Sequence, residues 1–482
     1  MNGNKKTIIN IITSGGQVAL IGVIYYFLYK YLLNALGVKM LGVWSVVMST
    51  SSLANIADLG IATSMVRYVA IYEHKNNLSR IPQLIFTGIV LNIIIFIPIC
   101  FIIWPIAYFL LANIIETGYL PIARELLPFS LFCVFLNSLA GVYGSILDGF
   151  RKNYIRNSIF SFSSLVFLIL TIFSVKLFGL IGVVWAQVIQ SFLSLCLCLI
   201  FGARLIKHNP FKWRFNKTIF KEIFNYGVKF QLTSLTGMLN EPVTKMLISK
   251  FGGLAFAGYY EMANKLVMQI RGVIVSANQS LMPLLVKESV DSTSKRRFSV
   301  LSLSFAGVFF FSLIVLSIIN IIGTPISKIW IGHNEPIFTN VLLLISICMF
   351  INLLSAPTYF NLLSINRLGP IIISQVIVLS INLVFGFIFG YYIGGSGIVL
   401  TWMIAVIVGS WYLITALNAK ETLSIIKELN LYPICILAID IITVIASMQN
   451  IINVFVILSA NISITAFFIW LVYRKVNTEY HV

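Results

Sequence analysis

The feature that most constrains this chain is a series of apolar runs, each about 20 residues long, that recur along its whole length. A helical run of this length crosses the hydrocarbon core of a bilayer. The runs are continuous and do not alternate polar with apolar residues, which favours helices over the strands of a membrane barrel. Only 10% of the residues are charged, against roughly 25% in a soluble domain. The sequence therefore predicts an all-α polytopic membrane protein.

We count fourteen predicted spans. Their centres lie near Leu20, Ile56, Ile95, Phe135, Leu165, Phe192, Gly237, Arg271, Phe311, Phe350, Leu379, Ala405, Ile441 and Ala460. The first ten residues, MNGNKKTIIN, are basic like the start of a signal peptide, but the apolar run behind them continues to about Leu33 without a small-residue cleavage site. We therefore expect the first run to remain attached as a membrane helix.

The basic residues of the connections alternate from one loop to the next. Starting at the N-terminus, every second connection together holds twenty-two Lys and Arg residues, whereas the other seven connections hold only four. The positive-inside rule then places both termini in the cytoplasm. The net charge of +18 is explained by this topology, so we expect no nucleic-acid partner.

Two parts of the chain share matching residues, the landmarks of a possible repeat, at nearly the same sequence separation, or offset. Three pairs have the same separation, namely Gly37 with Gly253, Gly42 with Gly258 and Arg151 with Arg367, and a fourth, Gly182 with Gly397, is shorter by a single position. We interpret this as two six-helix bundles related by a parallel repeat, an arrangement found in transporters. The predicted domains are residues 1–206, a cytoplasmic amphipathic linker at 207–222, a second bundle at 223–420, and two additional helices at 421–482.

Several ionisable residues lie deep inside predicted spans, where a lone charge costs at least ~2.5 to 3.5 kcal/mol. Glu241 and Lys245 share one helix face, and so do Glu261 and Lys265. Each pair is explained either by mutual neutralisation that pins the helices together, or by a place on the wall of a central cavity. Pro242, directly after Glu241, loosens the preceding helical turn and predicts a helix that bends between two states.

Arg271 lies near the middle of its predicted span and has no acid three or four residues away. A guanidinium can bind a phosphate through two parallel hydrogen bonds, so Arg271 is a candidate ligand for a pyrophosphate or an acidic sugar. We add Lys265, Lys245 and Arg67 as candidate substrate-binding cations, although Arg67 is close enough to a span end to reach the interface instead.

The blocks LGVKMLGVW and ADLGI near the start of the chain, and FGGLAFAGYYEMANKL at the start of the second half, resemble those of Wzx-type polysaccharide repeat-unit flippases. These transporters of O-antigen and capsule units belong to the multidrug/oligosaccharidyl-lipid/polysaccharide (MOP) superfamily, and the resemblance covers nearly the whole chain. It implies a V-shaped pair of six-helix bundles that alternate between inward- and outward-open states in a bacterial inner membrane. The implied cargo is an oligosaccharide on undecaprenyl pyrophosphate, with membrane lipids and a polysaccharide polymerase complex as further partners.

Coupling to H⁺ or Na⁺ is left open between the two ions, with Glu241, Asp58 and Glu261 as the candidate coupling residues, and we expect no cofactor. Within the same superfamily, a lipid II flippase and a multidrug cation antiporter are the alternatives. The seven basic and five acidic residues in or near the spans favour an anionic cargo over a cationic one.

A membrane-embedded enzyme is the alternative from another functional class. The predicted outside loops are too short for a catalytic domain, and the four histidines show no nucleophile–base or metal-ligand spacing. The six cysteines fall inside apolar runs, as expected of small apolar residues. No GxxxxGK[ST] motif is present, so ATP is not expected to drive transport directly.

Overall fold

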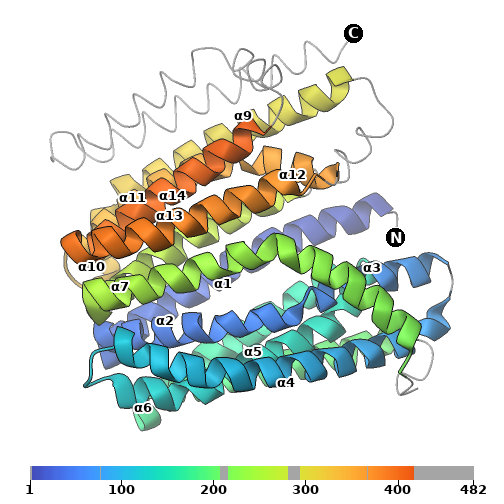
Figure 1. Cartoon of the computed structure of the whole chain (residues 1–482), viewed down its shortest axis with the longest axis horizontal. Helices are drawn as coiled ribbons and strands as arrows, with labels where there is room; N and C mark the ends of the chain where they lie inside the picture. The colour runs from blue at the N-terminus through green and yellow to red at the C-terminus, as the bar shows by residue number, and fades with distance from the viewer. Residues whose placement is uncertain (1–2, 76, 207–214, 280–293, 366, 417–482) are drawn as a thin grey trace. The chain divides into compact units, whose positions relative to one another are not determined.

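A computed structural model describes residues 3–75, 77–206, 215–279, 294–365 and 367–416 (Figure 1). Every regular element in these ranges is a helix, which confirms the predicted all-α class. In chain order the elements are α1 (Gly3–Leu36), α2 (Val38–Ser52), the 3₁₀ helix η1 (Leu53–Asp58), α3 (Ile61–His74), η2 (Leu78–Arg80), α4 (Ile81–Ile114), α5 (Leu120–Gly149), α6 (Asn153–Leu205), α7 (Lys217–Gln279), α9 (Ser294–Ile321), α10 (Gly323–Ile331), α11 (Pro336–Leu354), α12 (Ala356–Ser364), α13 (Gly369–Ile393) and α14 (Gly395–Thr415).

Within the described residues, nine helices are long and apolar enough to cross a membrane. Their hydropathy and length make the chain a multi-pass membrane protein. The predicted number of fourteen spans stays a prediction, because the two spans expected within 421–482 lie outside the described residues. So do 207–214 of the predicted linker, whereas its end belongs to α7, which begins at Lys217.

Two of the longest helices turn back on themselves at a single glycine. Non-helical backbone at Gly179 divides α6, and Ser174 on one side donates a hydrogen bond of 2.9 Å to the Gly182 carbonyl on the other. Gly253 divides α7 in the same way, since Lys245 lies 2.7 Å from Glu261 across the turn. Both glycines have positive φ, which a residue with a side chain adopts only at a cost.

The landmarks of the predicted repeat share their local geometry. Gly37, between α1 and α2, has φ 81° and ψ 164°, and its counterpart Gly253 has φ 80° and ψ 171°. A Cβ on Gly182 would meet the carbonyl oxygen of Ser174, and one on Gly397 would meet that of Phe389, in each case on the preceding arm of a hairpin. These positions therefore carry glycine for the same steric reasons in both halves of the sequence.

The described chain forms two compact units, and each is considered by itself. The first contains residues 1–262 and 379–402, and here α5 packs against α2, α3, α4 and α6 (Figure 1). A core of large apolar side chains from α3, α4 and α5, among them Met65, Leu84 and Ile146, is almost fully buried. In the second unit, α9 packs against α11 and α12, and α10 packs against α11.

The predicted span centred on Ile56 is interrupted rather than continuous. After α2 the chain continues as the 3₁₀ helix η1, and then Leu59 and Gly60 both adopt left-handed conformations before α3 begins. A Cβ on Gly60 would lie 2.8 Å from the carbonyl oxygen of Gly227 in α7, so this bend allows two backbones to approach closely. The interruption places Asp58 at the end of a helical segment.

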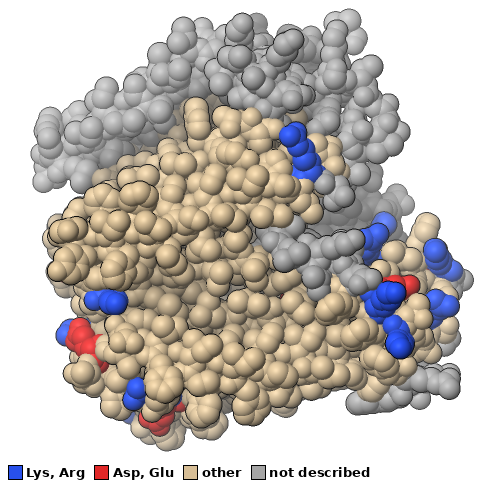
Figure 2. Space-filling view, viewed as in Figure 1, with Lys and Arg blue, Asp and Glu red and all other residues tan. Residues whose placement is uncertain are grey.

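Charged side chains on the visible face lie near helix ends. In Figure 2, over the part of the face formed by α2, α4 and α5, blue and red atoms gather at the two ends and the stretch between them is uncharged. This distribution is expected of a surface that contacts lipid hydrocarbon along its middle.

Candidate functional site

Three of the predicted intramembrane residues form one ionic cluster in the first unit. The Lys245 ammonium lies 2.7 Å from a carboxylate oxygen of Glu241 and 2.7 Å from one of Glu261. The Glu241 contact follows from the predicted i, i+4 spacing, whereas the Glu261 contact requires the turn at Gly253. The Lys245 and Glu261 side chains are 7% and 9% exposed, so removing the Lys245 charge would leave the Glu261 carboxylate buried without its ion-pair partner.

Two hydroxyl groups from the first two helices also contact Glu261. Tyr29 in α1 and Ser45 in α2 each donate a hydrogen bond of 2.8 Å to its carboxylate, one to each oxygen. Tyr29 also contacts the rings of Tyr25 and Trp44, with centroid distances of 5.6 and 5.9 Å. We call Tyr29, Ser45, Glu241, Lys245 and Glu261 the crossing cluster, because it joins α1 and α2 to the two arms of α7.

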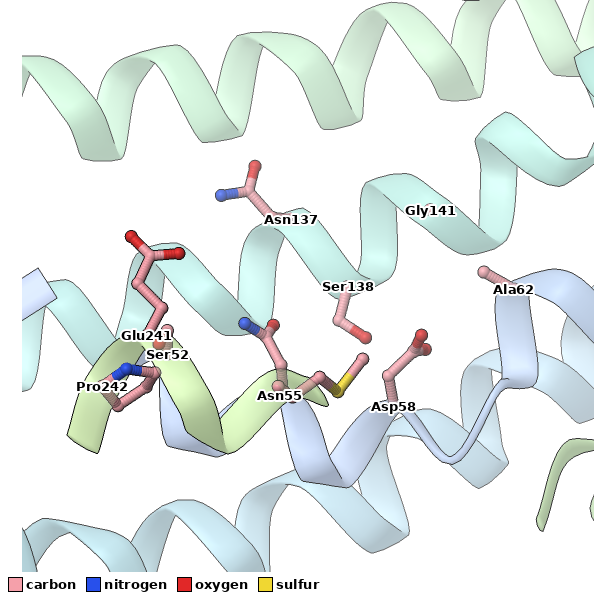
Figure 3. A pocket seen from close by; sticks show the side chains of 10 residues that line it. Ser52, Asn55, Asp58, Ala62, Asn137, Ser138, Gly141, Glu241 and Pro242 are labelled. Atoms are coloured by element: carbon pink, nitrogen blue, oxygen red, sulfur yellow. The ribbon is translucent and has the colours of Figure 1, made fainter. Parts of the chain in front are cut away.

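Glu241 also lines a cavity of about 390 Å³ in the same unit. Its lining residues are Ser52, Asn55, Asp58, Ala62, Asn137, Ser138, Gly141, Met238, Glu241 and Pro242. Figure 3 shows Asp58 and Glu241 at opposite sides of this group, with Asn55 between them in the view. The cavity therefore combines two carboxylates with amide and hydroxyl groups.

Asp58 is held by neutral donors. Its carboxylate lies within hydrogen-bonding reach of the Ala62 backbone N–H and the Ser138 hydroxyl, and Ser138 in turn accepts a hydrogen bond of 2.6 Å from Asn92. The Oδ1 atom of Asp58 is buried without a hydrogen-bond partner among the described residues. Such an oxygen is suited to accept a proton or a hard cation.

The described residues contain no group of three or more His, Cys, Asp or Glu side chains that could hold a metal ion. Two carboxylates with amide and hydroxyl oxygens are hard ligands, whereas thiolate and imidazole are the groups that select transition metals. The cavity thus offers hard oxygen ligands from carboxylate, amide and hydroxyl groups.

Arg271 lies in the second unit, and its Nε donates a hydrogen bond of 3.1 Å to the side-chain oxygen of Asn352. Asn352 is oriented by its own hydrogen bond of 3.0 Å to Ser410. In the described part of the chain no acidic side chain forms an ion pair with Arg271. The Asn352 contact uses Nε and not the terminal amino groups, and Tyr359 and Cys348 are further neighbours of the guanidinium.

The two other predicted cations occupy different settings. Arg67 is on α3 with an exposed side chain, and Lys265 is on the second arm of α7 and is half-buried. The structure therefore brings Glu241, Lys245 and Glu261 together, and Asp58 lines the same cavity as Glu241. Arg271 lies in the other unit, as does Lys265.

Sequence reasoning missed the neutral partners of these groups, namely Tyr29, Ser45, Asn55, Ser138 and Asn352. For two of them the repeat offset was an available signal. The offset that relates Gly37 to Gly253 also relates Ser45 to Glu261 and Tyr29 to Lys245. Ser45, which donates to Glu261, is thus the repeat counterpart of Glu261, and Tyr29, the other donor, is the counterpart of Lys245. Nothing in the local sequence around Asn55, Ser138 or Asn352 marks them.

Comparisons with known proteins give a consistent picture. A family model described as polysaccharide biosynthesis protein matches residues 5–289. Among solved structures, the fold is similar to the lipid II flippase MurJ in an inward closed conformation, with a TM-score of 0.73 and 18% identity over 97% of this chain and 99% of that one. No curated protein sequence matches the chain.

Two further structures share the fold. An inward-facing multidrug resistance MATE family transporter of the MOP superfamily gives a TM-score of 0.69 at 16% identity, covering 85% of this chain and 98% of that one. A MOP superfamily transporter from Pyrococcus furiosus, described by the reverse polarity of its binding pocket, gives 0.60 at 15% identity, covering 87% and 97%. At these identities the likeness shows the fold alone.

Proposed function

This chain belongs to the polysaccharide biosynthesis protein family, and we propose that it is a flippase for undecaprenyl-pyrophosphate-linked oligosaccharide repeat units. It moves them from the cytoplasmic to the outer leaflet of a bacterial inner membrane, by alternating access, for O-antigen or other surface polysaccharide synthesis. The family match and a fold similar to a lipid II flippase support a lipid-linked cargo.

The observation that carries this proposal is the setting of Arg271. Its Nε is fixed by Asn352, and it has no ion-pair partner among the acidic side chains of the described residues. A guanidinium inside a membrane protein is costly unless it meets an anion or water. A pyrophosphate presents several anionic oxygens that match the geometry of this group. Lys265, Lys245 and Arg67 remain candidates for further contacts with the same cargo.

Transport is coupled, in this proposal, to a proton or a sodium ion bound in the Asp58–Glu241 cavity. The buried Oδ1 of Asp58, which has no hydrogen-bond partner within the described ranges, and the neighbouring amide and hydroxyl groups support this assignment. Glu241 lines the cavity and also contacts Lys245, so it links the cavity to the crossing cluster. Glu261, which is buried in contact with Lys245, is the third candidate coupling residue.

The proposal is tested by surface-polysaccharide production in a deletion strain complemented with wild type, Arg271→Lys or Arg271→Ala. Membrane levels are checked by immunoblot. We expect the wild type to restore production. Arg271→Ala should reduce it at least about tenfold, because the two parallel charge-assisted hydrogen bonds of the guanidinium fork are lost. Arg271→Lys keeps the charge but not the fork, and we expect it to restore little. Full activity of Arg271→Ala would remove Arg271 from the site.

A second candidate is a multidrug cation antiporter, favoured by the two carboxylates of the cavity and by a fold similar to a MATE family transporter. An acidic cavity attracts an organic cation in the same way that it attracts a coupling ion. Growth of the deletion strain with cationic drugs distinguishes the two functions, because only an antiporter protects the cells. A lipid II flippase differs in the sugar part of its cargo, so it is separated by a competition experiment with purified lipid II.

A further inference from the structure

The crossing cluster lies where two hairpins of the first unit meet. One hairpin is α1–Gly37–α2, and the other is formed by the two arms of α7 around Gly253. A Cβ on Gly42 would meet the carbonyl oxygen of Leu254, and one on Gly258 would lie 2.5 Å from that of Val38. Val38 and Leu254 are themselves separated by the repeat offset. The contact is therefore reciprocal, and the hairpins are related by a local twofold axis.

The polar contacts of the crossing cluster follow the same axis. Ser45 and Glu261 are repeat counterparts and share a hydrogen bond of 2.8 Å across it. Tyr29 and Lys245 are counterparts too, and both contact the Glu261 carboxylate. The second repeat supplies all three charges of the crossing cluster, on Glu241, Lys245 and Glu261, whereas the first supplies only hydroxyl groups. Every bond between the hairpins in this set is thus a hydroxyl donating to one carboxylate.

This division of charge suits a contact that opens and closes. If the hairpins separate, Glu261 keeps Lys245 as its partner, because both residues lie on arms of α7. No charge is then left buried and unpaired, which is the most costly result of breaking a buried ion pair. Among the contacts of the crossing cluster, the bonds that break are those of the Tyr29 and Ser45 hydroxyl groups, and water can replace each of them. Glycines at the crossing bring the backbones together without interlocking side chains.

We propose that the crossing cluster is a lock, centred on Glu261, that holds the two hairpins together and is released whenever this end of the protein opens. By the predicted topology, Gly37 and Gly253 belong to outside connections, so the lock closes the outer end. The inference rests on the proposed function only in requiring a protein with two states. Its test reads conformation rather than transport, so failure of the lock and failure of the flippase assignment are separate results.

The reporter is a single cysteine, Ala257→Cys, in the full-length protein with the native cysteines replaced. Ala257 is 2% exposed and shares a face of α7 with Leu254 and Glu261, so a maleimide reaches it only when the hairpins separate. The rate of labelling is measured in nanodiscs. Glu261→Ser is expected to raise it about tenfold, the effect of losing hydrogen bonds to a charged group.

Because the hairpins are related by a local twofold axis, the side chains at positions 45 and 261 can be exchanged. If Glu261 only fills space, this exchange is not expected to restore the contact between the hairpins. Moving the carboxylate to its counterpart, in the double variant Ser45→Glu with Glu261→Ser, returns it to the reach of both Tyr29 and Lys245. We expect the double variant to restore labelling to within about twofold of wild type. If labelling of the swap is as fast as that of Glu261→Ser, or faster, the lock is wrong.

Two further variants keep the test decisive. Tyr29→Phe and Ser45→Ala remove only a donor between the hairpins, and each is expected to raise labelling about threefold even if Glu261→Ser is poorly folded. The matched control is Glu116→Gln, which breaks the exposed Lys39–Glu116 ion pair of 3.0 Å. Both residues of this pair belong to the first half of the sequence. The control should leave labelling unchanged. Wild-type labelling rates in Tyr29→Phe and Ser45→Ala would overturn the proposal.

Discussion

Ser45 and Glu261 occupy the same position in two repeats and share a hydrogen bond of 2.8 Å between their side chains. A bond between repeat counterparts requires them to meet on the axis that relates the repeats. At this axis the two sequences differ in chemistry, since a hydroxyl faces a carboxylate. The repeat thus produces a symmetric backbone crossing with an asymmetric distribution of charge.

The backbone crossing depends on two glycines. Gly42→Ala and Gly258→Ala each place a methyl group against the backbone of the other hairpin, so we expect each to destabilise the protein by roughly 1–3 kcal/mol. Gly16→Ala in α1 is the control, because a Cβ there meets nothing within 4 Å. The midpoint of thermal unfolding in detergent should fall for the first two variants and stay or rise for the third. An unchanged midpoint in Gly42→Ala would contradict the close approach.

The cavity is expected to couple transport to an ion gradient. Asp58→Asn and Glu241→Gln keep the size of each side chain but remove its charge, so cation binding is lost. Transport in proteoliposomes should fall to the rate measured without a pH or sodium gradient, a decrease of roughly tenfold or more. Ser52→Ala, which changes the same cavity without removing a charge, should keep most of the gradient dependence. Gradient-driven transport by Asp58→Asn would exclude the cavity as the coupling site.

The predicted topology is tested with exposed lysines on the two sides. Lys75 lies in a predicted inside connection and Lys176 in a predicted outside one, and both side chains are exposed. In a cysteine-free background, Lys176→Cys should be labelled by a membrane-impermeant maleimide in intact spheroplasts, whereas Lys75→Cys should be labelled only after lysis. The reverse pattern would place both termini outside the cytoplasm.

Local patterns predicted the helices and part of the site. The spacing of Glu241 and Lys245 on one helix face is confirmed by their contact of 2.7 Å, and glycines at the repeat landmarks share their backbone geometry. The repeat offset also contained the pairing of Ser45 with Glu261, but no rule of local sequence says that counterparts touch. That contact requires the crossing of two hairpins that are far apart in the chain.

Other features depend on backbone details that the apolar pattern does not show. The run around Ile56 reads as one span, yet η1 and the left-handed Leu59 and Gly60 interrupt it. At this bend Gly60 closely approaches Gly227 on α7, a tertiary contact that the apolar pattern does not encode. Asn352, which orients Arg271, was equally hidden, because it is one of many polar residues within apolar runs.

The most direct test of the proposed function is leaflet exchange of a purified substrate. Proteoliposomes containing the protein are loaded with fluorescent undecaprenyl-pyrophosphate-linked oligosaccharide, and the outer-leaflet fraction is followed with an impermeant quencher. We predict exchange well above that of protein-free liposomes, and a loss of at least about tenfold in Arg271→Ala. Exchange no faster than in protein-free liposomes, in a preparation that exports a cationic dye, would contradict the flippase and favour the antiporter.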